Sequence, residues 1–327
     1  MIELREVVKS FGPTRAVDRV SLRFAPGSLT ALIGASGSGK STLLRLINRL
    51  IDCDSGDILL DGADIRRGPP ELLRRRIGYV IQSIGLFPHW TVARNIGAVP
   101  TLLGWTAAQI HARVDELLAL LGLDAAAYRG RYPHQLSGGQ QQRIGVARAL
   151  AARPALLLMD EPFGALDPLT RLSLQQTLLD LQHSQRCTTV LVTHDIDEAL
   201  RLGDQLVLLH QGRVLQAGTP LQLLAQPASD AVRHFLGREA LGLRLLGQRR
   251  VASLLRPGDV AMGAANGAAN GVAVRTAVGA PLRPGQTLLD ALAAFLAQGV
   301  EVLPVADDHG QALGAVRFTD LLRGDRA

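Results

Sequence analysis

The chain has 327 residues, 47% of them hydrophobic, which is enough for one large domain and a smaller one. No stretch approaches the roughly 18 consecutive apolar residues of a membrane-spanning helix, and the charged start MIELREVVKS is unlike a signal peptide, so we expect a soluble cytosolic protein. The net charge of +6 comes from dispersed arginines and the 2 cysteines lack metal-ligand spacing, which argues against a nucleic-acid surface, a disulfide framework and a cysteine metal site.

The N-terminal part of the chain has the apolar alternation and the turn residues of short β-strands. The last of these strands closes at Asp61 and Gly62, a pair typical of turns. From Trp105 to Leu121 the apolar residues change to helical spacing and fall on one face of a helix. The expected strands are 2–11, 20–25, 28–34 and 56–62.

After Ser137 the chain alternates between helical segments and apolar strands, the pattern of a parallel sheet covered by helices on both faces. A hairpin with its turn at Gln211 and Gly212 follows. The sequence therefore predicts an α/β fold. The expected helices run from Ser137 to Ala151, over 168–184 and from Ile196, and the expected strands are 155–160, 188–193 and the hairpin 204–218.

Around Gly237 the organisation changes. The segment 263–271, GAANGAANG, repeats small residues without any periodicity, and we expect a linker or an eroded element there. Residues 282–324 then predict a β-α-β-β-α unit whose last short helix is capped by Thr319. The expected parts are a domain at 1–237 with a helical subdomain at about 88–152, a linker or a degraded first copy of the C-terminal unit at 238–280, and a small α+β domain at 281–327.

A glycine-rich loop follows the strand LTALI and precedes a helical segment, which is the context of a phosphate-binding loop. Its backbone N–H groups converge on phosphate oxygens at a helix N-terminus, while Lys40 reaches the β- and γ-phosphates and Ser41 suits Mg²⁺. We expect the whole loop to bind nucleotide: Gly34, Ala35, Ser36, Gly37, Ser38, Gly39, Lys40, Ser41 and Thr42.

The apolar strand ALLLMD ends in Asp160, and the next residue is Glu161, so two carboxylates are adjacent in the sequence. A buried strand places Asp160 at the carboxyl end of the sheet, beside the phosphate-binding loop, where it can orient Mg²⁺ through water. Glu161 is then placed to hold an attacking water. Paired acids after a strand are often only a solvated turn, so this reading depends on Lys40 being nearby.

A second glycine-rich helix start, Ser137 to Gly139, offers a hydroxyl, backbone N–H groups and a positive dipole end to an anion, but no lysine. One nucleotide needs only one such loop. The segment is therefore either a second wall that closes over a γ-phosphate held elsewhere or a glycine-rich helix cap without a ligand.

Five motifs follow one another in the chain: the phosphate-binding loop, LSGGQ at Leu136 to Gln140, LLLMDEP, GALD at Gly164 to Asp167, and THD at Thr193 to Asp195. In this order they resemble the nucleotide-binding subunit of ATP-binding-cassette (ABC) transporters over residues 1 to about 237. The resemblance implies the P-loop NTPase fold of ABC-type ATPases, with an antiparallel β subdomain and a helical subdomain, and ATP and Mg²⁺ as cofactors.

In that family two copies pair head to tail, and each ATP lies between the phosphate-binding loop of one copy and the LSGGQ motif of the other. The resemblance implies that Ser137 and Gly139 contact the γ-phosphate bound by the partner copy, with Gly138 and Gln140 in the same nucleotide contact. It also implies that Asp167 acts across the dimer interface.

The same resemblance assigns three further roles. Phe11 takes the place of the aromatic residue that stacks on adenine. Gln82 takes that of the glutamine that senses Mg²⁺ and the membrane partner, and His194 that of the switch histidine at the γ-phosphate. The implied partners are a second copy of the chain, a transmembrane permease and, indirectly, a solute-binding protein, with no nucleic acid. The chain would then lie on the cytoplasmic face of the inner membrane as a peripheral subunit.

The segment 82–105, the tetrapeptide INRL and the residues around LSGGQ resemble the importers of glycine betaine, choline and related osmoprotectants. Phe87 and Trp90 are either an exposed anchor for the permease or core of the helical subdomain. Residues 281–322 resemble a single CBS motif, and we favour a regulatory or dimer-stabilising role for this region over ligand sensing.

Three alternatives remain to be weighed. An importer of another solute, such as a polar amino acid, shares every motif of the ATP site, although the CBS-like region argues against it. A DNA-repair ATPase would separate Lys40 from Ser137 by long coiled coils, and no heptads lie between them. A translation-associated protein would carry two cassettes in one chain.

Overall fold

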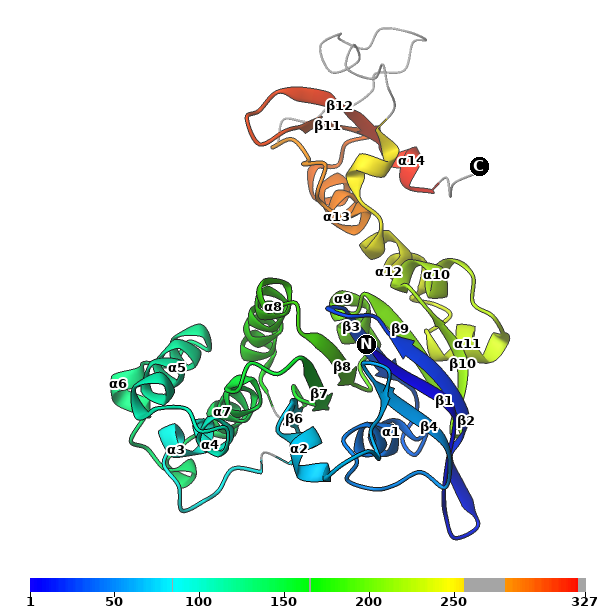
Figure 1. Ribbon diagram of the computed structural model, residues 1–327. Helices are drawn as coiled ribbons and strands as arrows, with labels where there is room; N and C mark the ends of the chain where they lie inside the picture. Colours follow the sequence, from blue (N-terminus) through cyan, green and yellow to red (C-terminus); the bar gives the residue numbers. More distant parts are fainter. Residues whose placement is uncertain (84, 165, 256–279, 323–327) are drawn as a thin grey trace, which may run out of the picture. The chain divides into compact units, whose positions relative to one another are not determined.

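The computed structural model describes residues 1–83, 85–164, 166–255 and 280–322. The chain divides into two compact units, Met1–Pro220 and Leu221–Ala327 (Figure 1). The boundary predicted after residue 237 therefore lies inside the second unit. Among the described residues, no helix has both the length and the apolar character needed to cross a bilayer.

An antiparallel sheet of four strands forms one part of the first unit, in the order β2-β1-β4-β5. In β2, side chains alternate between buried and exposed from Asp18 to Phe24, as a sheet with one face on a core requires, whereas β1 begins with three consecutive buried residues. The strand predicted at 20–25 is the end of the longer β2. The strands are β1 (Ile2–Phe11), β2 (Thr14–Phe24), β4 (Ser55–Leu60) and β5 (Ala63–Asp64).

A six-stranded sheet has the order β10-β9-β3-β8-β7-β6. All neighbouring pairs are parallel except the hairpin β9–β10, which turns at Gln211 and Gly212 as expected. The short strand β6 was not predicted. The strands are β3 (Leu29–Ile33), β6 (Ile77–Val80), β7 (Leu156–Asp160), β8 (Thr188–Val192), β9 (Gln205–His210) and β10 (Arg213–Gly218).

Strand β7 shows how this sheet is covered on both faces. Leu156 and Leu158 belong to one core, shared with α1 (Lys40–Ile47) and the antiparallel sheet. Leu157 and Met159 belong to a second core, shared with the helices on the other face. Since successive side chains of a strand point to opposite faces, the continuous apolar run fits a central strand.

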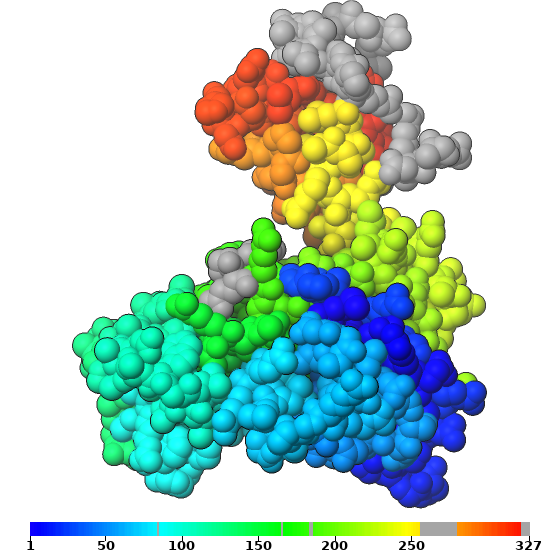
Figure 2. All heavy atoms as spheres, in the orientation of Figure 1, coloured from blue at the N-terminus to red at the C-terminus, as the bar shows by residue number. Residues whose placement is uncertain are grey.

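The helices of the first unit lie mostly between β6 and β8 in the chain. In Figure 2 they form the cyan and green side of its surface, and the N-terminal strands form the blue side. Thr106, with Gln109, makes the capping box that starts α5. The helices are α2 (Pro70–Arg74), α3 (Val92–Ile96), α4 (Ala98–Leu102), α5 (Ala107–Leu120), α6 (Ala125–Tyr128), α7 (Gly138–Leu150), α8 (Pro168–Gln185) and α9 (Ile196–Leu202), with a 3₁₀ turn, η1 (Pro133–Gln135).

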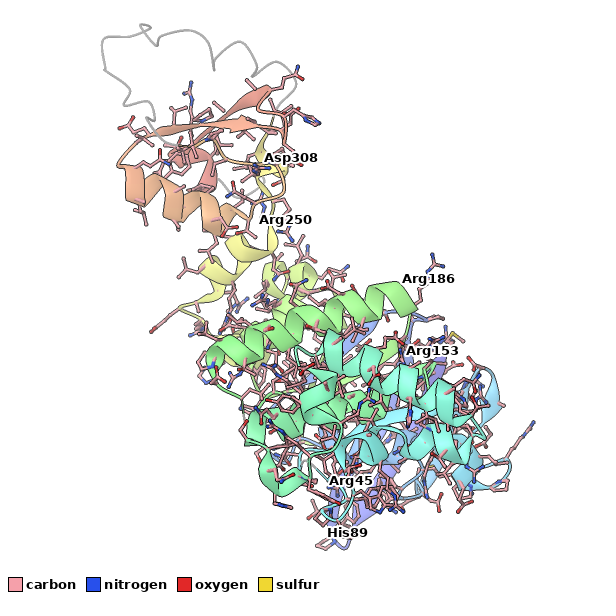
Figure 3. All side chains as sticks on the ribbon, turned by 90° about the vertical axis from the view of Figure 1, so that its left-hand side faces the viewer. Arg45, His89, Arg153, Arg186, Arg250 and Asp308 are labelled. Atoms are coloured by element: carbon pink, nitrogen blue, oxygen red, sulfur yellow. The ribbon has the colours of Figure 1, made fainter. Side chains whose placement is uncertain are left out.

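Two arginines mark the turns that lead from a helix into a parallel strand. Arg153 lies between α7 and β7, and Arg186 between α8 and β8, both with left-handed backbone (φ 50° and 49°). Both side chains are exposed, and Figure 3 labels them near each other, away from Arg45. They mark the amino edge of the sheet.

The second unit has a core of its own around Val251, Phe295 and Val316. Val251 and α12 lie within the predicted linker, and 263–271 is outside the described residues. The last helix begins at Phe318, so Thr319 is inside it rather than its cap. Asp320 instead accepts a hydrogen bond from the N–H of Arg317. The elements are α10 (Pro220–Ala225), α11 (Asp230–Phe235), α12 (Leu241–Gln248), η2 (Val251–Leu254), α13 (Leu288–Gln298), β11 (Val302–Ala306), β12 (Ala312–Arg317) and α14 (Phe318–Leu322).

Candidate functional site

The carboxyl edge of the parallel sheet carries the predicted chemistry. Gly34 follows β3, Gln82 lies just after β6, Glu161 follows β7 and His194 lies just after β8. Parallel strands deliver the residues after them to one edge, so segments distant in the chain meet there.

The phosphate-binding loop is packed so tightly that two positions accept only glycine. A Cβ on Gly34 (φ 150°) would lie 2.2 Å from the Leu209 carbonyl oxygen, and one on Gly39 (φ 101°) would lie 2.2 Å from that of Ala16. The loop therefore rests on β9 and on the antiparallel sheet at once, with a backbone that L side chains rarely adopt.

Lys40 holds its ammonium group inside this loop. Nζ donates to the carbonyl oxygens of Gly34 and Ala35, both at 2.8 Å, and to Ser38 Oγ at 3.2 Å. Burial lowers the pKa of Lys40, and the nearby carboxylates of Asp160 and Glu161 act in the opposite direction. A positive charge is thus placed where the backbone N–H groups of the loop favour an anion.

Ser41 and Asp160 join the helix after the loop to the end of β7. Ser41 Oγ donates to Asp160 Oδ1 at 2.8 Å. Asp160 is only 4% exposed, and burial raises its pKa, against the lowering effect of the hydrogen bond from Ser41. The expectation that Asp160 lies beside the phosphate-binding loop is met.

Glu161 is held by side chains from the two neighbouring strands. Gln82 Nε2 donates to Oε2 at 3.0 Å, and His194 Nδ1 lies 3.3 Å from Oε1. Its backbone is left-handed, with φ 49°, and its N–H donates to the Val192 carbonyl oxygen at 3.0 Å. A non-glycine residue in this conformation is strained, and such strain clusters at functional sites.

The segment Ser137 to Gln140 forms a capping box at the start of α7. Gln140 N–H donates to Ser137 Oγ at 3.3 Å, and Ser137 N–H donates to Gln140 Oε1 at 3.0 Å. Gln140 Nε2 also donates to the Tyr128 hydroxyl at 3.0 Å. Within the described residues, none of the hydrogen bonds of this segment reaches the phosphate-binding loop.

The contacts of Phe11 and Asp167 are with residues other than the Lys40 group. Phe11 ends β1 with half of its surface exposed, and Lys9 Nζ lies 5.7 Å from its ring centroid. Asp167 is the N-cap of α8 and accepts a hydrogen bond from the Thr170 N–H at 3.1 Å. Hydrogen bonds from Thr170 lower the pKa of Asp167, so the structure gives this carboxylate a capping role by itself.

Comparisons with known proteins give the same assignment as the motifs. A family described as "ABC transporter" matches residues 17–164. The glycine betaine uptake system ATP-binding protein YehX of Escherichia coli (strain K12) is 55% identical over 98% of this chain and 99% of its own. The chain belongs to the ABC transporter family.

Two more members of the ABC transporter family show how far the likeness extends. The glycine betaine/carnitine/choline transport ATP-binding protein OpuCA of Bacillus subtilis (strain 168) is 41% identical over 98% of this chain and 95% of its own. A dimeric post-hydrolysis structure of the cassette MJ0796 bound to ADP and Pi has a TM-score of 0.62 and 33% identity, covering 67% of this chain and 99% of that one.

Both glycine-rich helix starts lie in the first unit, but at different places within it. Figure 1 shows α1 and α7 on different sides of the parallel sheet, which agrees with the two cores to which they belong. The Lys40 group lies at the start of α1, and the Ser137 segment lies at the start of α7.

One contact beside the candidate site was not predicted from the sequence. Gln142, on α7 and 2% exposed, donates from Nε2 to the carbonyl oxygen of Pro162, the residue directly after Glu161, at 2.6 Å. A glutamine among the core-facing positions of α7 is the signal that could have identified it. The hydrogen bond joins the LSGGQ helix to the loop that follows Glu161.

The aromatic pair before α3 is neither wholly core nor wholly exposed. Phe87 is 43% exposed, and its ring centroid lies 4.4 Å from that of Trp90. Arg94 stacks on the other ring at 4.3 Å. Asn95, fully buried, fixes this turn through the backbone of Phe87, Trp90 and Thr91.

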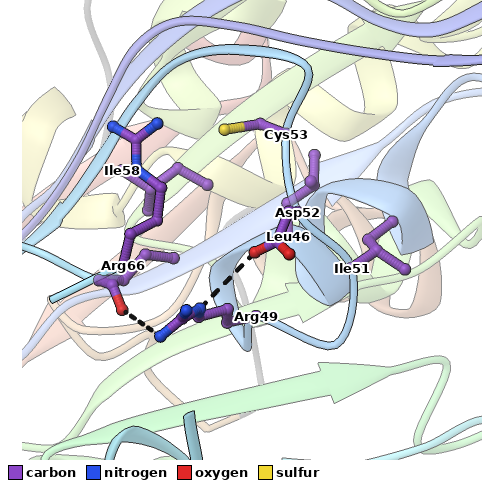
Figure 4. A pocket seen from close by; sticks show the side chains of 8 residues that line it. Leu46, Arg49, Ile51, Asp52, Cys53, Ile58 and Arg66 are labelled. Carbon is purple, nitrogen blue, oxygen red and sulfur yellow. Dashed lines mark hydrogen bonds and ion pairs between the residues drawn. The ribbon is translucent and has the colours of Figure 1, made fainter. Parts of the chain in front are cut away.

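The pocket beside Cys53 is structural. Arg49 lies across it, donating to the Ile65 carbonyl oxygen at 3.2 Å and pairing with Asp52 at 3.6 Å (Figure 4). Its volume is about 10 Å³, room for one water molecule. Burial raises the pKa of the Cys53 thiol and raises that of Cys187 to about 11, so both thiols stay protonated and unreactive.

Proposed function

We propose that this chain is the ATP-hydrolysing subunit that powers import of an osmoprotectant, such as glycine betaine, choline or a related quaternary amine, through a membrane permease. The grouping of Lys40, Ser41, Asp160 and Glu161 at one sheet edge supports hydrolysis of ATP. The choice of substrate is based on sequence identity, over nearly the full chain, to relatives that are named for these solutes.

The phosphate-binding loop fits a triphosphate. Its glycines leave the backbone free to approach phosphate oxygens, and the N-terminus of α1 adds a positive dipole end. Lys40 is already turned into the loop by three short hydrogen bonds, so phosphate oxygens need only replace carbonyl and hydroxyl acceptors. Phe11, exposed at the end of β1, offers a ring face for adenine.

The oxygen donors beside this loop fit Mg²⁺. Ser41 Oγ and Asp160 Oδ1 are already 2.8 Å apart, and Gln82 lies on the same edge. Mg²⁺ is usually held by one or two carboxylates together with waters and substrate phosphates, and Asp160 with Ser41 can provide the protein part of such a set. When bound, Mg²⁺ neutralises charge on the transferred phosphoryl group.

Glu161 is placed to orient the attacking water. Gln82 and His194 fix its two carboxylate oxygens from opposite neighbours, so the carboxylate is held before the substrate arrives. In phosphoryl transfer most of the catalysis is positioning and charge stabilisation, which is what such a fixed carboxylate supplies. His194 then lies beside the same water and the γ-phosphate.

A second copy of the chain completes the site. Among the described residues of one copy, the side-chain hydrogen bonds of Ser137 and Gln140 stay within the start of α7 or reach Tyr128, and none joins the Lys40 group. Gly138 and Gly139 belong to the same helix start. We propose that these four residues close over the nucleotide of the partner, with Asp167 at the interface, in a head-to-tail dimer. Hydrolysis then depends on dimer closure.

The remaining partners are a permease and an extracytoplasmic solute-binding protein. The half-exposed Phe87, packed at a tilt against Trp90, offers the permease an aromatic contact on the helical subdomain. The chain then sits on the cytoplasmic face of the inner membrane as a peripheral subunit. The small CBS-like domain of the second unit serves dimer stability or regulation.

Uptake by cells that lack this gene tests the proposal. Labelled glycine betaine and choline are offered at high osmolarity, with a polar amino acid as the competing solute. The intact gene is expected to restore quaternary-amine uptake, whereas a gene carrying Glu161→Gln is not. Restored uptake of the amino acid alone would instead assign the chain to the alternative importer class.

A further inference from the structure

A small cavity lies beside Glu161 and His194. Its volume is about 60 Å³, room for a few water molecules. The loop after β7 and the loop after β8 form two of its walls, and Arg171 of α8 and Glu198 of α9 form the others. Everything that fixes these two loops also fixes the surroundings of Glu161.

Arg171 touches both loops at once. Its Nη2 donates to the Leu166 carbonyl oxygen at 3.2 Å, in the loop that leads from Glu161 to Asp167. Its Nη1 lies 3.8 Å from Asp195 Oδ2, in the loop that carries His194. The planar guanidinium group is suited to such a bridge, since its N–H groups point in fixed, divergent directions.

Helix stability does not explain this arginine. Arg171 lies in the first turns of α8, which begins at Pro168 and is capped by Asp167. A cation near a helix N-terminus is disfavoured by the helix dipole. Its Nε is buried without a protein partner among the described residues, which also costs stability unless cavity water meets it.

The far end of the bridge is rigid. Asp195 caps α9 by accepting from the N–H groups of Asp197 and Glu198 at 2.9 and 3.1 Å. Glu198, 7% exposed, accepts from Gln175 Nε2 of α8 at 3.0 Å. The loop of His194 is thus fixed to α9, and Arg171 links that assembly to the loop after Glu161.

We propose that Arg171 is a positioning residue that holds the Glu161 loop and the His194 loop in one arrangement around the attacking water. The inference rests on the proposed ATP hydrolysis. Arg171 itself touches neither the nucleotide nor the attacking water in this scheme. It acts through Leu166 and Asp195, so that a dimer contact that displaces Asp167 also changes the position of His194.

Three variants of the full-length chain, in complex with its permease, test this. Arg171→Met removes the bridge, and Arg171→Lys keeps the charge but reaches only one loop. Asp180→Asn removes a charge from an exposed contact on the same helix and serves as the control. ATPase rate is measured against ATP concentration, together with ATP affinity, melting temperature and amide exchange of the two loops.

We expect kcat to fall about 10- to 100-fold in both Arg171 variants, because loss of the bridge displaces the groups around the attacking water. KM and ATP affinity should stay within about twofold of the wild-type values. Melting temperature should stay level or rise in Arg171→Met, because an unfavourable cation leaves the helix start. Both loops should exchange faster. Asp180→Asn should match the wild type in every measurement.

Two results overturn the proposal: a kcat for Arg171→Met equal to wild type, or full recovery by Arg171→Lys, which would show that charge alone matters. If Arg171→Met misfolds, Asp195→Asn removes the ion pair and keeps the cap, and should lower kcat alone. A wild-type complex that hydrolyses no ATP refutes the proposed function instead, and the exchange measurements still decide whether Arg171 joins the loops.

Discussion

Two glycines of the phosphate-binding loop allow the packing of this site to be tested. Gly37 and Gly39 both have left-handed backbone, with φ 76° and 101°, but a Cβ on Gly37 meets nothing within 4 Å, whereas one on Gly39 meets the Ala16 carbonyl oxygen at 2.2 Å. Each alanine substitution forces the disfavoured conformation, at about 1–2 kcal/mol. Only Gly39→Ala also requires the loop and β2 to separate.

The separation needed is about 1 Å, since contacts much below 3.2 Å are repulsive, and overpacking of this kind typically costs about 1–3 kcal/mol. Replacing glycine by alanine also lowers the conformational entropy of the unfolded chain, but this effect is the same for both variants and cancels in the comparison. For a unit of this size the difference corresponds to an unfolding temperature about 2–12 °C lower for Gly39→Ala than for Gly37→Ala.

Calorimetry of the nucleotide-free chain measures this difference directly, and equilibrium binding of ATP follows. Gly39→Ala should also bind ATP more weakly than the wild type, because Lys40 begins the displaced helix. Equal unfolding temperatures for the two variants would refute the reasoning, since they would show that the loop does not rest on β2 as described.

Glu161→Gln should lower turnover about 100-fold or more and retain an ATP-bound dimer, seen as doubled mass in light scattering; turnover at the wild-type rate would contradict the assignment. Burial raises the pKa of Glu198, so the folded state binds its proton more tightly than the unfolded state and loses stability as pH rises above the ordinary value of 4.5. Glu198→Gln should therefore raise the unfolding temperature at neutral pH and give no gain at about pH 4, where both states are protonated; a gain independent of pH would exclude this cause. Phe295→Ala, at a ring packed edge-on against Phe318, should destabilise the second unit by about 3–5 kcal/mol and leave ATP affinity unchanged; lost affinity would show that the units depend on each other.

The sequence identified most of the site because its signals are local. The phosphate-binding loop and the acids after β7 each need only a strand, a turn and the residues that follow, and these are visible as a continuous pattern. The short strand β6 escaped because four residues carry too little periodicity. Thr319 was misassigned as a cap because Asp320 accepts from the N–H of Arg317, and the helix starts two residues earlier than expected.

Contacts between distant segments could not be predicted in this way. Gln142 meets the Pro162 carbonyl oxygen, and Arg171 bridges to Asp195, yet neither spacing carries a recognisable pattern. The second unit gave a similar result: Val251, within the segment predicted as a linker or a degraded copy, is fully buried in the core of that unit. The apolar run VASLL is too short to reveal from its pattern what it packs against.

By itself, the sequence determined the chemistry of this protein: one lysine in a glycine-rich loop, two acids after a buried strand, and a second helix start without a lysine. The tertiary structure decided which of these groups meet. In the parallel sheet β3 lies between β8 and β9, and β7 between β6 and β8, an order that differs from the order in the chain. Gln82 and His194 therefore reach Glu161 from opposite sides, because strand order, and not sequence distance, sets which loops share an edge.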